Sequence, residues 1–447
     1  MTPAQADPPG DAGRHHKPIK VVAFGGGHGL AASLRALRHC GPKLDLDITA
    51  VVTVGDNGGS SGRLRAERDA QLPPGDLRMA LTALADDEPA HQVMVRLMQH
   101  RFAPVGNPDR RATAHATQTG SGPASAEGPA DGGSAAAAGP ADGSAAAAGP
   151  AGGLRAAGGP AIGMEAAAGP ADGAGAAAGP AEGSVAAAGP AEGSAAGVGG
   201  KSGWGSVDRR VAALGGKHDP LAGHAVGNLL LLGLLELMDD PVDALRHAGA
   251  MVGARGQVLP MACHAVGIEA DVRGGDPARP GEVVTVRGQH AVAVAGGHVE
   301  AVRIVPASPP ACPAALDAIG EADWLIFGPG SWYTSVLPHL LVPELAAAIV
   351  ASPARRLVTL NLAADNETLG LSVADHLAAL HWYLPQLHVD TVLADAKWVG
   401  EPDPVHRAAE ALGARLVLAP LAVADGSPRH DPESLGAALV PVLGSDR

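Results

Sequence analysis

Aromatic side chains are scarce in this sequence: Phe, Trp and Tyr make up only 2% of the 447 residues. None of them lies in residues 122–200, where Gly-Pro recurs at a ten-residue period in blocks such as AAAAGPADGS. Ala and Gly offer too little apolar surface to offset the entropy of ordering such a tract. We therefore predict a long disordered Ala/Gly/Pro insertion at 104–203. It is either a tolerated expansion of a surface loop or a specific tether.

Cysteine, basic runs and long apolar runs are also lacking. The three cysteines, Cys40, Cys263 and Cys312, are widely spaced without a CxxC or Cys/His metal pattern, which is typical of a reducing cytoplasm. A net charge of −14 without a basic run argues against nucleic acid or anionic membranes as partners. The longest apolar run, Leu229–Leu235, is too short to span a bilayer. We expect a cytoplasmic protein, with its oligomeric state left open.

Short apolar runs alternate with helical patterns along the rest of the chain. A strand buried on both faces typically has a continuous apolar run, as in Ile48–Val54. Three further short and mostly apolar segments are also predicted strands: Ile19–Phe24, Ala322–Phe327 and Leu357–Leu362. Leucines at helical spacing follow Ile19–Phe24, and Asp219-Pro220 is a good N-cap and first-turn pair for a helix reaching Met238. This alternation predicts an α/β fold with a Rossmann-like, doubly wound, mostly parallel sheet.

Apolar and polar residues alternate from Val283 to Val305, which indicates antiparallel strands in a β-rich appendage near 256–306. The predicted organisation is a disordered N-terminus at 1–17, a first core segment at 18–103, the insertion at 104–203 and the rest of the core at 204–445.

The glycine turn after the first run, Gly25–Gly29, suits a phosphate, because glycines let the backbone approach it and the next helix offers free N–H groups. Read from Gly27 to Ala32, it also matches the dinucleotide fingerprint, but weakly. Asp47 has the spacing of the ribose-binding acid yet precedes the second predicted strand. A phosphate or nucleotide site, an NAD site and a purely structural turn therefore stay as alternatives.

A second glycine loop, Asp56–Arg63, packs a carboxylate, an amide, two hydroxyls and a guanidinium into eight residues. Hydroxyls and N–H groups can cradle phosphate, Arg63 can fork onto it, and Asp56 could hold a ribose, a sugar hydroxyl or Mg²⁺. The alternative is an Asn-Gly turn with a helix cap. The following turn, Pro73–Asp76, places Asp76 to cap the next helix, or to join the site.

Two further segments carry polar residues beside apolar ones. His224 and Asn228 are four apart on the predicted helix after the insertion and share a face, as ligand contacts or as satisfied core groups. The loop Gly328–Ser335 closes the third strand with small residues, hydroxyls and two rings, which suit a diphosphate, stacking or simple packing. No Ser/His/Asp order, paired-carboxylate motif or metal spacing indicates catalysis.

Six motifs, taken together in this order, resemble the YvcK-like gluconeogenesis factor family of the CofD-like superfamily. They cover about residues 19–103 and 219–395 and read VVAFGGGHGLAASLRAL, ITAVVTVGDNGGSSGRLR, PPGDLRMALTALA, GHAVGNLLLLGLLE, ADWLIFGPGSWYTSVLPHLLVPEL and SVADHLAAL. The resemblance implies a core that binds a UDP-sugar, notably UDP-N-acetylglucosamine, and that supports cell-wall precursor supply and cell shape during gluconeogenic growth. It also implies a cell-wall precursor enzyme as a regulated partner.

The CofD branch implies a different activity, the transfer of a phospholactyl group from a guanosine diphosphate donor with a divalent metal. This chain departs from the family pattern at His28, where relatives usually have Thr, at Asn57, where they usually have Asp, and in Asn361–Gly370. The loss of the second carboxylate weakens a metal site.

We predict a non-catalytic UDP-sugar-binding regulator that needs no cofactor; the alternative is a CofD-like 2-phospholactate transferase, for which alone Mg²⁺ is considered. The predicted nucleotide-sugar-binding residues are Gly26, Gly27, His28, Gly29, Asp56, Asn57, Gly59, Ser60, Ser61, Gly62, Arg63, Asp76, Arg78, His224, Asn228, Gly328, Gly330, Ser331, Thr334 and Ser335. The prediction requires the turns at Gly25, Asp56 and Gly328 to meet at one edge of the sheet.

Overall fold

The computed structural model describes residues 17–104 and 219–445, apart from residues 69, 277, 280, 364, 365, 369 and 370. Apart from residues 17 and 104, the predicted disordered N-terminus (1–17), the predicted insertion (104–203) and the segment 204–218 lie outside the described residues, so the predicted domain boundaries stay predictions.

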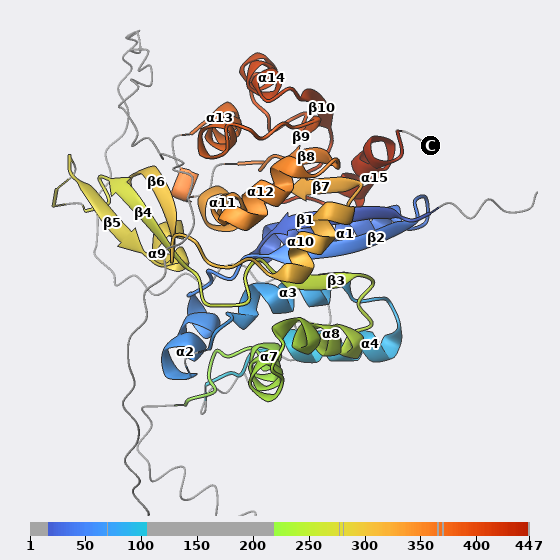
Figure 1. The fold of residues 1–447 in the computed structure, drawn as a ribbon, viewed down its shortest axis with the longest axis vertical. Helices are drawn as coiled ribbons and strands as arrows, with labels where there is room; N and C mark the ends of the chain where they lie inside the picture. The colour runs from blue at the N-terminus through green and yellow to red at the C-terminus, as the bar shows by residue number, and fades with distance from the viewer. Residues whose placement is uncertain are drawn as a thin grey trace, which may run out of the picture. The chain divides into compact units, whose positions relative to one another are not determined.

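A seven-stranded sheet forms the centre of the described chain (Figure 1). Every pairing in it is parallel. Its strands, in spatial order, are β10 (Arg415–Ala419), β9 (Thr391–Asp395), β8 (Arg355–Thr359), β7 (Trp324–Phe327), β1 (Ile19–Gly25), β2 (Leu46–Val52) and β3 (Gln257–Pro260). The predicted Rossmann-like α/β fold is confirmed, and all four predicted strands are present.

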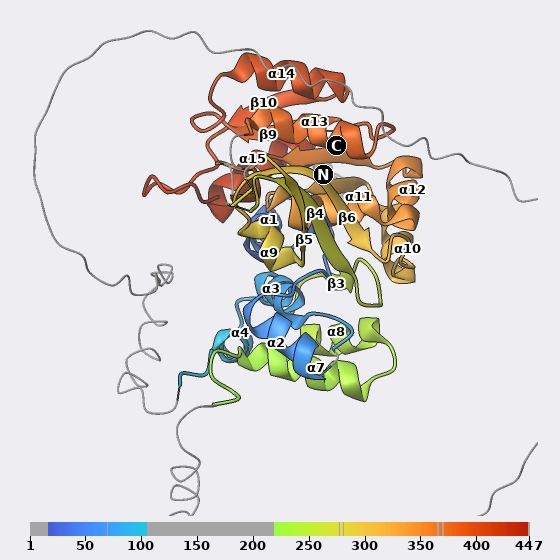
Figure 2. The same ribbon diagram turned by 90° about the vertical axis from the view of Figure 1, so that its left-hand side faces the viewer.

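Helices cover both faces of this sheet. After β1 the chain adds β2 and β3 in one direction across the sheet, and after β7 it adds β8, β9 and β10 in the opposite direction. Because the crossovers are right-handed, the two sets of helices lie on opposite faces of the sheet. The first face carries α1 (Gly27–Cys40), α3 (Pro74–Leu84) and α15 (Pro432–Leu443). The second carries α10 (Pro313–Glu321), α11 (Leu337–Leu341), α12 (Pro343–Ala351), α13 (Val373–Tyr383) and α14 (Pro402–Ala411). Figure 2 shows α10 and α12 across the strands from α1.

The long connection from β2 to β3 adds a helical layer beside α3 (Figures 1 and 2). It contains α2 (Gly59–Arg68), α4 (Pro89–Gln99), α7 (Val226–Leu237) and α8 (Pro241–Met251). The predicted helix start at Asp219 is wrong, because the carboxylate of Asp219 accepts from Leu221 N in a turn (3.2 Å) and the helix begins only at Val226. His224 therefore precedes the helix that carries Asn228.

The predicted β-rich appendage is an antiparallel sheet of three strands, β5 (Val283–Arg287), β4 (Gly267–Arg273) and β6 (His298–Val305), in that order. It stands beside the end of the parallel sheet in Figure 1. The short helix α9 (Gln289–Ala293) joins β5 to β6. Two further single-turn elements, η3 (Trp332–Val336, a π-helix) and η4 (Asn366–Thr368, a 3₁₀ helix), follow β7 and β8.

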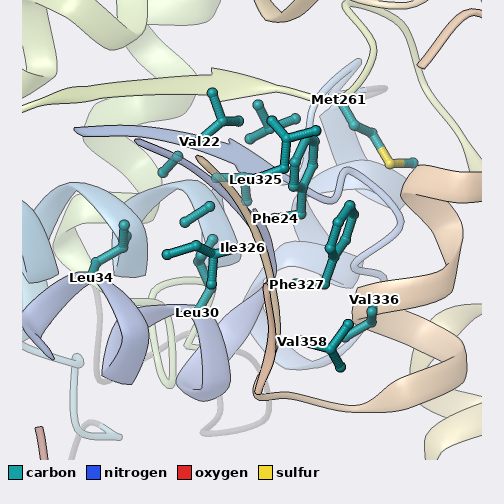
Figure 3. Packing of buried hydrophobic residues seen from close by; sticks show 14 of the residues in the cluster. Val22, Phe24, Leu30, Leu34, Met261, Leu325, Ile326, Phe327, Val336 and Val358 are labelled. Carbon is teal, nitrogen blue, oxygen red and sulfur yellow. The ribbon is translucent and has the colours of Figure 1, made fainter. Parts of the chain in front are cut away.

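The core lies between the central strands and the helices around them (Figure 3). Phe24 of β1 and Phe327 of β7 are paired in register, and their rings stack at 4.8 Å with an interplanar angle of 8°. Such a ring pair adds about 0.5–1.5 kcal/mol to the free energy of burial. It fixes the carboxyl ends of β1 and β7 side by side, immediately before their glycine turns. Among the described residues, no single helix is both long and apolar enough to cross a membrane.

Candidate functional site

The chain reverses its direction of travel across the sheet between β1 and β7. The helix after β1 leads to one side and the helices after β7 lead to the other. In open α/β sheets, ligands bind beyond the carboxyl ends of the strands at such a switch point. The turns Gly25–Gly29 and Gly328–Ser331 both lie there.

The first glycine turn, Gly25–Gly29, contacts the third glycine turn, Gly328–Ser331, through backbone atoms. A Cβ added at Gly29 would lie 2.3 Å from the carbonyl oxygen of Pro329 and 2.4 Å from Cα of Gly330. Ser33 of α1 also donates to the carbonyl of Gly328 (2.7 Å). Helix α1 begins at Gly27, after Gly26, with no side chain of its own segment capping it. The N-terminal amides of α1 therefore face the switch point.

The second loop joins the first turn through the start of α3. A Cβ added at Gly75 would lie 2.5 Å from Oδ2 of Asp56, and one added at Gly26 would lie 2.5 Å from Oδ2 of Asp76. Asp56, Asp76 and Gly26 are thus consecutive neighbours along the carboxyl edge. The prediction that the turns at Gly25, Asp56 and Gly328 meet at one edge of the sheet is confirmed.

Asp76 lies beneath the first turn. Its carboxylate accepts from the hydroxyl of Thr53 (3.2 Å) and from the amide of Gly27 at the start of α1. Burial, and then the negative charge of Asp56, raises the pKa of Asp76 to about 7. The prediction that Asp76 caps its own helix is wrong, because α3 begins after Pro73 without a side-chain cap. Asp76 instead binds the N-terminus of α1.

His28 is exposed in the first turn of α1. Neighbouring protein atoms displace solvent from around the imidazole ring, and this desolvation, followed by the positive charges of Arg35, Arg78 and Arg101, lowers the pKa of His28. Three arginine charges therefore act on the same position. Positive charges beside a helix N-terminus favour an anion, and here the amide of Gly27 already donates to the carboxylate of Asp76.

The second loop uses most of its polar groups within the protein. Asp56 Oδ1 accepts from Gly58 N (2.9 Å), and Ser61 Oγ accepts from Gly75 N (3.0 Å). Arg63 donates to the carbonyl of Ala222 (2.6 Å), in the segment before α7. Gly59 and Gly62 open α2, and a Cβ at Gly62 would meet the carbonyl of Asn57. The structure therefore places Arg63 and Ser61 in structural contacts rather than free beside the first turn.

A buried polar network links α2, α3 and α7. Ser60 Oγ bonds Nδ1 of His224 (2.8 Å) and accepts from Nδ2 of Asn228 (3.0 Å). Oδ1 of Asn228 accepts from Nε of Arg78 (2.7 Å), and Nη1 of Arg78 donates to the side-chain oxygen of Gln99. Burial, and then the charge of Arg101, lowers the pKa of Arg78 to about 10. These four predicted residues are brought together as an anchor under the second loop.

The third turn is closed by the strand next to it. The side chain of Asn361, after β8, accepts from Gly330 N and donates to its carbonyl, both at 2.9 Å. The carboxylate of Glu367 accepts from Tyr333 N and from the hydroxyl of Thr334, again at 2.9 Å. The hydroxyl of Thr334 is thus already engaged. Ser335 is buried and Ser331 is half-buried at the start of η3.

The small sheet brings two residues to this edge that the sequence analysis did not identify. Gln289 of α9 donates to the carbonyl of Thr334 (3.1 Å), while its Oε1 is buried without a hydrogen-bond partner. The amide of His290 donates to Oδ1 of Asn57 (2.9 Å). Gly288, with φ of +96°, immediately precedes α9. A glycine within an alternating strand pattern marks a break, so Gly288 could have indicated from the sequence that the strand ends before Gln289 and His290.

A pocket of about 260 Å³ lies at the opposite, amino edge of the sheet, lined by Lys20 and Asp47 among others. Asp47 is the second residue of β2, not a residue before the strand as expected. It cannot hold a ribose beside the first turn, because it lies at the other end of the strand. This placement removes the acidic partner of the dinucleotide fingerprint.

Fold and site define the chain as a Rossmann-like α/β protein whose glycine turns meet at the switch point between β1 and β7. The family model described as 2-phospho-L-lactate transferase CofD matches residues 21–414. A crystal structure of a UPF0052-family protein from Bacillus halodurans aligns with a TM-score of 0.60 and 26% identity, covering 95% of this chain and 99% of that chain.

Curated relatives extend over nearly the whole sequence. A Mycobacterium tuberculosis (strain H37Rv) protein that carries the gluconeogenesis factor name is 37% identical over 430 residues, 95% of this chain and 91% of that protein. The gluconeogenesis factor of Bacillus subtilis (strain 168) is 27% identical over 399 residues, 89% and 84% of the two chains. The chain therefore belongs to the CofD family, among its YvcK-like gluconeogenesis factors.

Proposed function

We propose that this protein binds a UDP-sugar, with UDP-N-acetylglucosamine as the leading ligand, at the carboxyl edge between β1 and β7, and acts as a regulator rather than as an enzyme. The observation that carries the proposal is the backbone contact between Gly29 and Pro329, which joins two glycine turns around the N-terminus of α1. The name of the Bacillus subtilis relative, gluconeogenesis factor, gives the metabolic context in which we place this ligand.

The electrostatics of this edge suit a diphosphate. Amides at a helix N-terminus and nearby guanidinium groups both stabilise a charged phosphate. The charges of Arg35, Arg78 and Arg101 act on His28, and Asp76, with a pKa of about 7, carries only part of a negative charge near neutrality. The side chain of Asp56, in the second loop, is then available to a ribose or sugar hydroxyl.

In its cellular role, the bound UDP-sugar reports the supply of cell-wall precursor, and the complex controls an enzyme of precursor synthesis that supports cell shape during gluconeogenic growth. The hydrogen bonding of the described residues agrees with a binding role. The hydroxyl of Thr334 donates to Glu367, and Ser60 Oγ is shared between His224 and Asn228. Both serve as buried anchors, because neither side chain is exposed to a bound ligand.

Isothermal titration calorimetry on the full chain tests the ligand. UDP-N-acetylglucosamine should bind, whereas NAD and GDP should bind weakly or not at all. Asp56→Asn should weaken binding at least several-fold, and Asp243→Asn, in an exposed ion pair with Arg246 on α8, is the matched control that should not. Absence of binding by the wild type would reject the proposal.

A phospholactyl transferase is the second candidate, because the matching family model carries that name. Its divalent metal finds a poor donor set here. Oδ1 of Asn57 accepts from the amide of His290, and burial raises the pKa of Asp76, so this edge offers few charged oxygen ligands. A metal ion prefers several charged oxygen ligands. Mg²⁺-dependent turnover of a nucleoside-diphosphate-activated phospholactate, lost in Asp56→Asn, would favour this candidate instead.

A further inference from the structure

Two cysteines that are far apart in the sequence lie next to each other beyond the carboxyl end of β3. Cys263 follows β3, and Cys312 is the residue immediately before α10. Their backbones run antiparallel there, with a bridge between Ala262 and Ala311 and a hydrogen bond from Cys312 N to the carbonyl of Met261 (3.2 Å). Both thiols are free.

The sulfur atoms interact directly. A hydrogen bond from the Cys263 thiol lowers the pKa of the Cys312 thiol to about 7, with help from the amides of Ala315 and Ala314 in the first turn of α10. The same hydrogen bond, together with burial, raises the pKa of Cys263. Cys312 is therefore the more acidic thiol of the pair, and Cys263 the less acidic one.

Access to the pair is through Cys263. Cys312 is fully buried, whereas Cys263 is half-buried and lines a pocket of about 400 Å³ together with His264 and Leu232. A hydroperoxide as small as hydrogen peroxide fits such a pocket. The cysteine that lines the pocket is thus backed by a buried and more acidic thiol.

We propose that Cys263 and Cys312 form a redox-modification site, which closes to an intramolecular disulfide when a hydroperoxide enters this pocket. Cys312 thiolate takes the proton of Cys263 as the Cys263 sulfur attacks the peroxide oxygen. The O–O bond breaks, Cys263 becomes a sulfenic acid, and the departing hydroxide recovers the proton from Cys312 as water. Cys312 thiolate then attacks the Cys263 sulfur, and the S–O bond breaks with release of hydroxide. The thiols lose two electrons and the peroxide gains them.

The third cysteine provides an internal control. Cys40 is fully buried in α1, its thiol donates to the carbonyls of Ala36 and Gly436 at 3.4 Å, and burial raises its pKa to about 11. It has neither a thiolate nor a sulfur neighbour, so peroxide should leave it unchanged.

The test treats the reduced full chain with hydrogen peroxide and then measures intact mass, thiol content after denaturation and the disulfide-linked peptides. We expect a loss of about 2 Da, a fall from three thiols to one, and a single linked peptide pair containing Cys263 and Cys312. Dithiothreitol should restore the mass. The oxidised protein should also melt a few degrees higher, because the bond closes a long loop.

Variants separate this site from general oxidation. Cys40→Ser should keep the full response, and Cys263→Ser, at a half-buried position, should abolish the internal bond. Cys312→Ser should do the same, and if it does not fold, the peptide map of the wild type decides. Three thiols retained at peroxide levels that oxidise free cysteine, an intermolecular dimer, or a bond that includes Cys40 would each overturn the proposal.

Discussion

Replacing Gly29 with Ala tests the contact between the first and third turns on which the site depends. Gly29 lies in the first turn of α1 and has no positive φ, so alanine fits its backbone without strain. The added Cβ would lie 2.3 Å from the Pro329 oxygen and 2.4 Å from Cα of Gly330. These are backbone atoms that cannot rotate aside, so α1 or the third turn has to move.

Overpacking of this kind costs about 1–3 kcal/mol. Alanine regains at most about 1 kcal/mol over glycine in a helix, and less in a first turn. We expect Gly29→Ala to lose roughly 1–2 kcal/mol of unfolding free energy. Gly233→Ala is the matched control, because Gly233 lies within α7 and an added Cβ there has no atom within 4 Å. That variant should gain up to about 1 kcal/mol.

Equilibrium urea unfolding of the full chain, followed by circular dichroism and tryptophan fluorescence, measures both changes, with the slope of the transition checked for each variant. The two substitutions share their chemistry and their effect on the unfolded chain. Opposite signs therefore isolate the contact with the third turn. If Gly29→Ala were as stable as Gly233→Ala, the two turns would not touch and the proposed site would lose its basis.

Three other predictions follow from the same region. Burial and the charge of Asp56 raise the pKa of Asp76 to about 7 in the folded protein, against about 3.9 when unfolded. The wild type should therefore lose up to about 4 kcal/mol of unfolding free energy between about pH 4 and pH 7, and Asp76→Asn should not. The same pH dependence in both proteins, measured by urea unfolding, would contradict this. Asn228→Ala leaves Nε of the buried Arg78 without its acceptor and removes one of the two side-chain bonds of Ser60, and it should cost about 2–4 kcal/mol in the same assay. A loss under about 0.5 kcal/mol would refute the network. The affinity for UDP-N-acetylglucosamine should rise as the pH falls below neutrality, because a bound diphosphate favours protonated His28. His28→Ala should remove this pH dependence. Calorimetry that finds the same wild-type affinity at every pH would reject the prediction.

The parts of the fold that the sequence predicts well are those with strong local signals. The strands β1, β2 and β7 are short and mostly apolar, and the glycine turns after them mark where each one ends. The strand β10 at the sheet edge was not identified, because its residues are only partly buried and its pattern is weak. The start of α7 was misplaced because Asp219 forms a turn that resembles a helix cap.

The partners of the site's polar groups could not be predicted. Ser60 and His224 are separated by 164 positions, and Thr334 pairs with Glu367 from a different strand connection. Only the folded backbone decides whether such hydroxyls face a ligand or each other. The convergence of the turns was predictable, since the carboxyl ends of parallel strands share an edge, but the division between binding and anchoring groups was not.

The position of β1 at the switch point also bears on how the protein is made. β1 ends at residue 25, and its neighbour β7 begins only at residue 324, so the ribosome produces nearly three quarters of the chain before one side of β1 can be paired. Until then the nascent protein carries an open strand edge, and open edges attract unintended pairing with other chains. Biosynthesis of this protein should therefore depend on holding that edge apart until β7 has emerged.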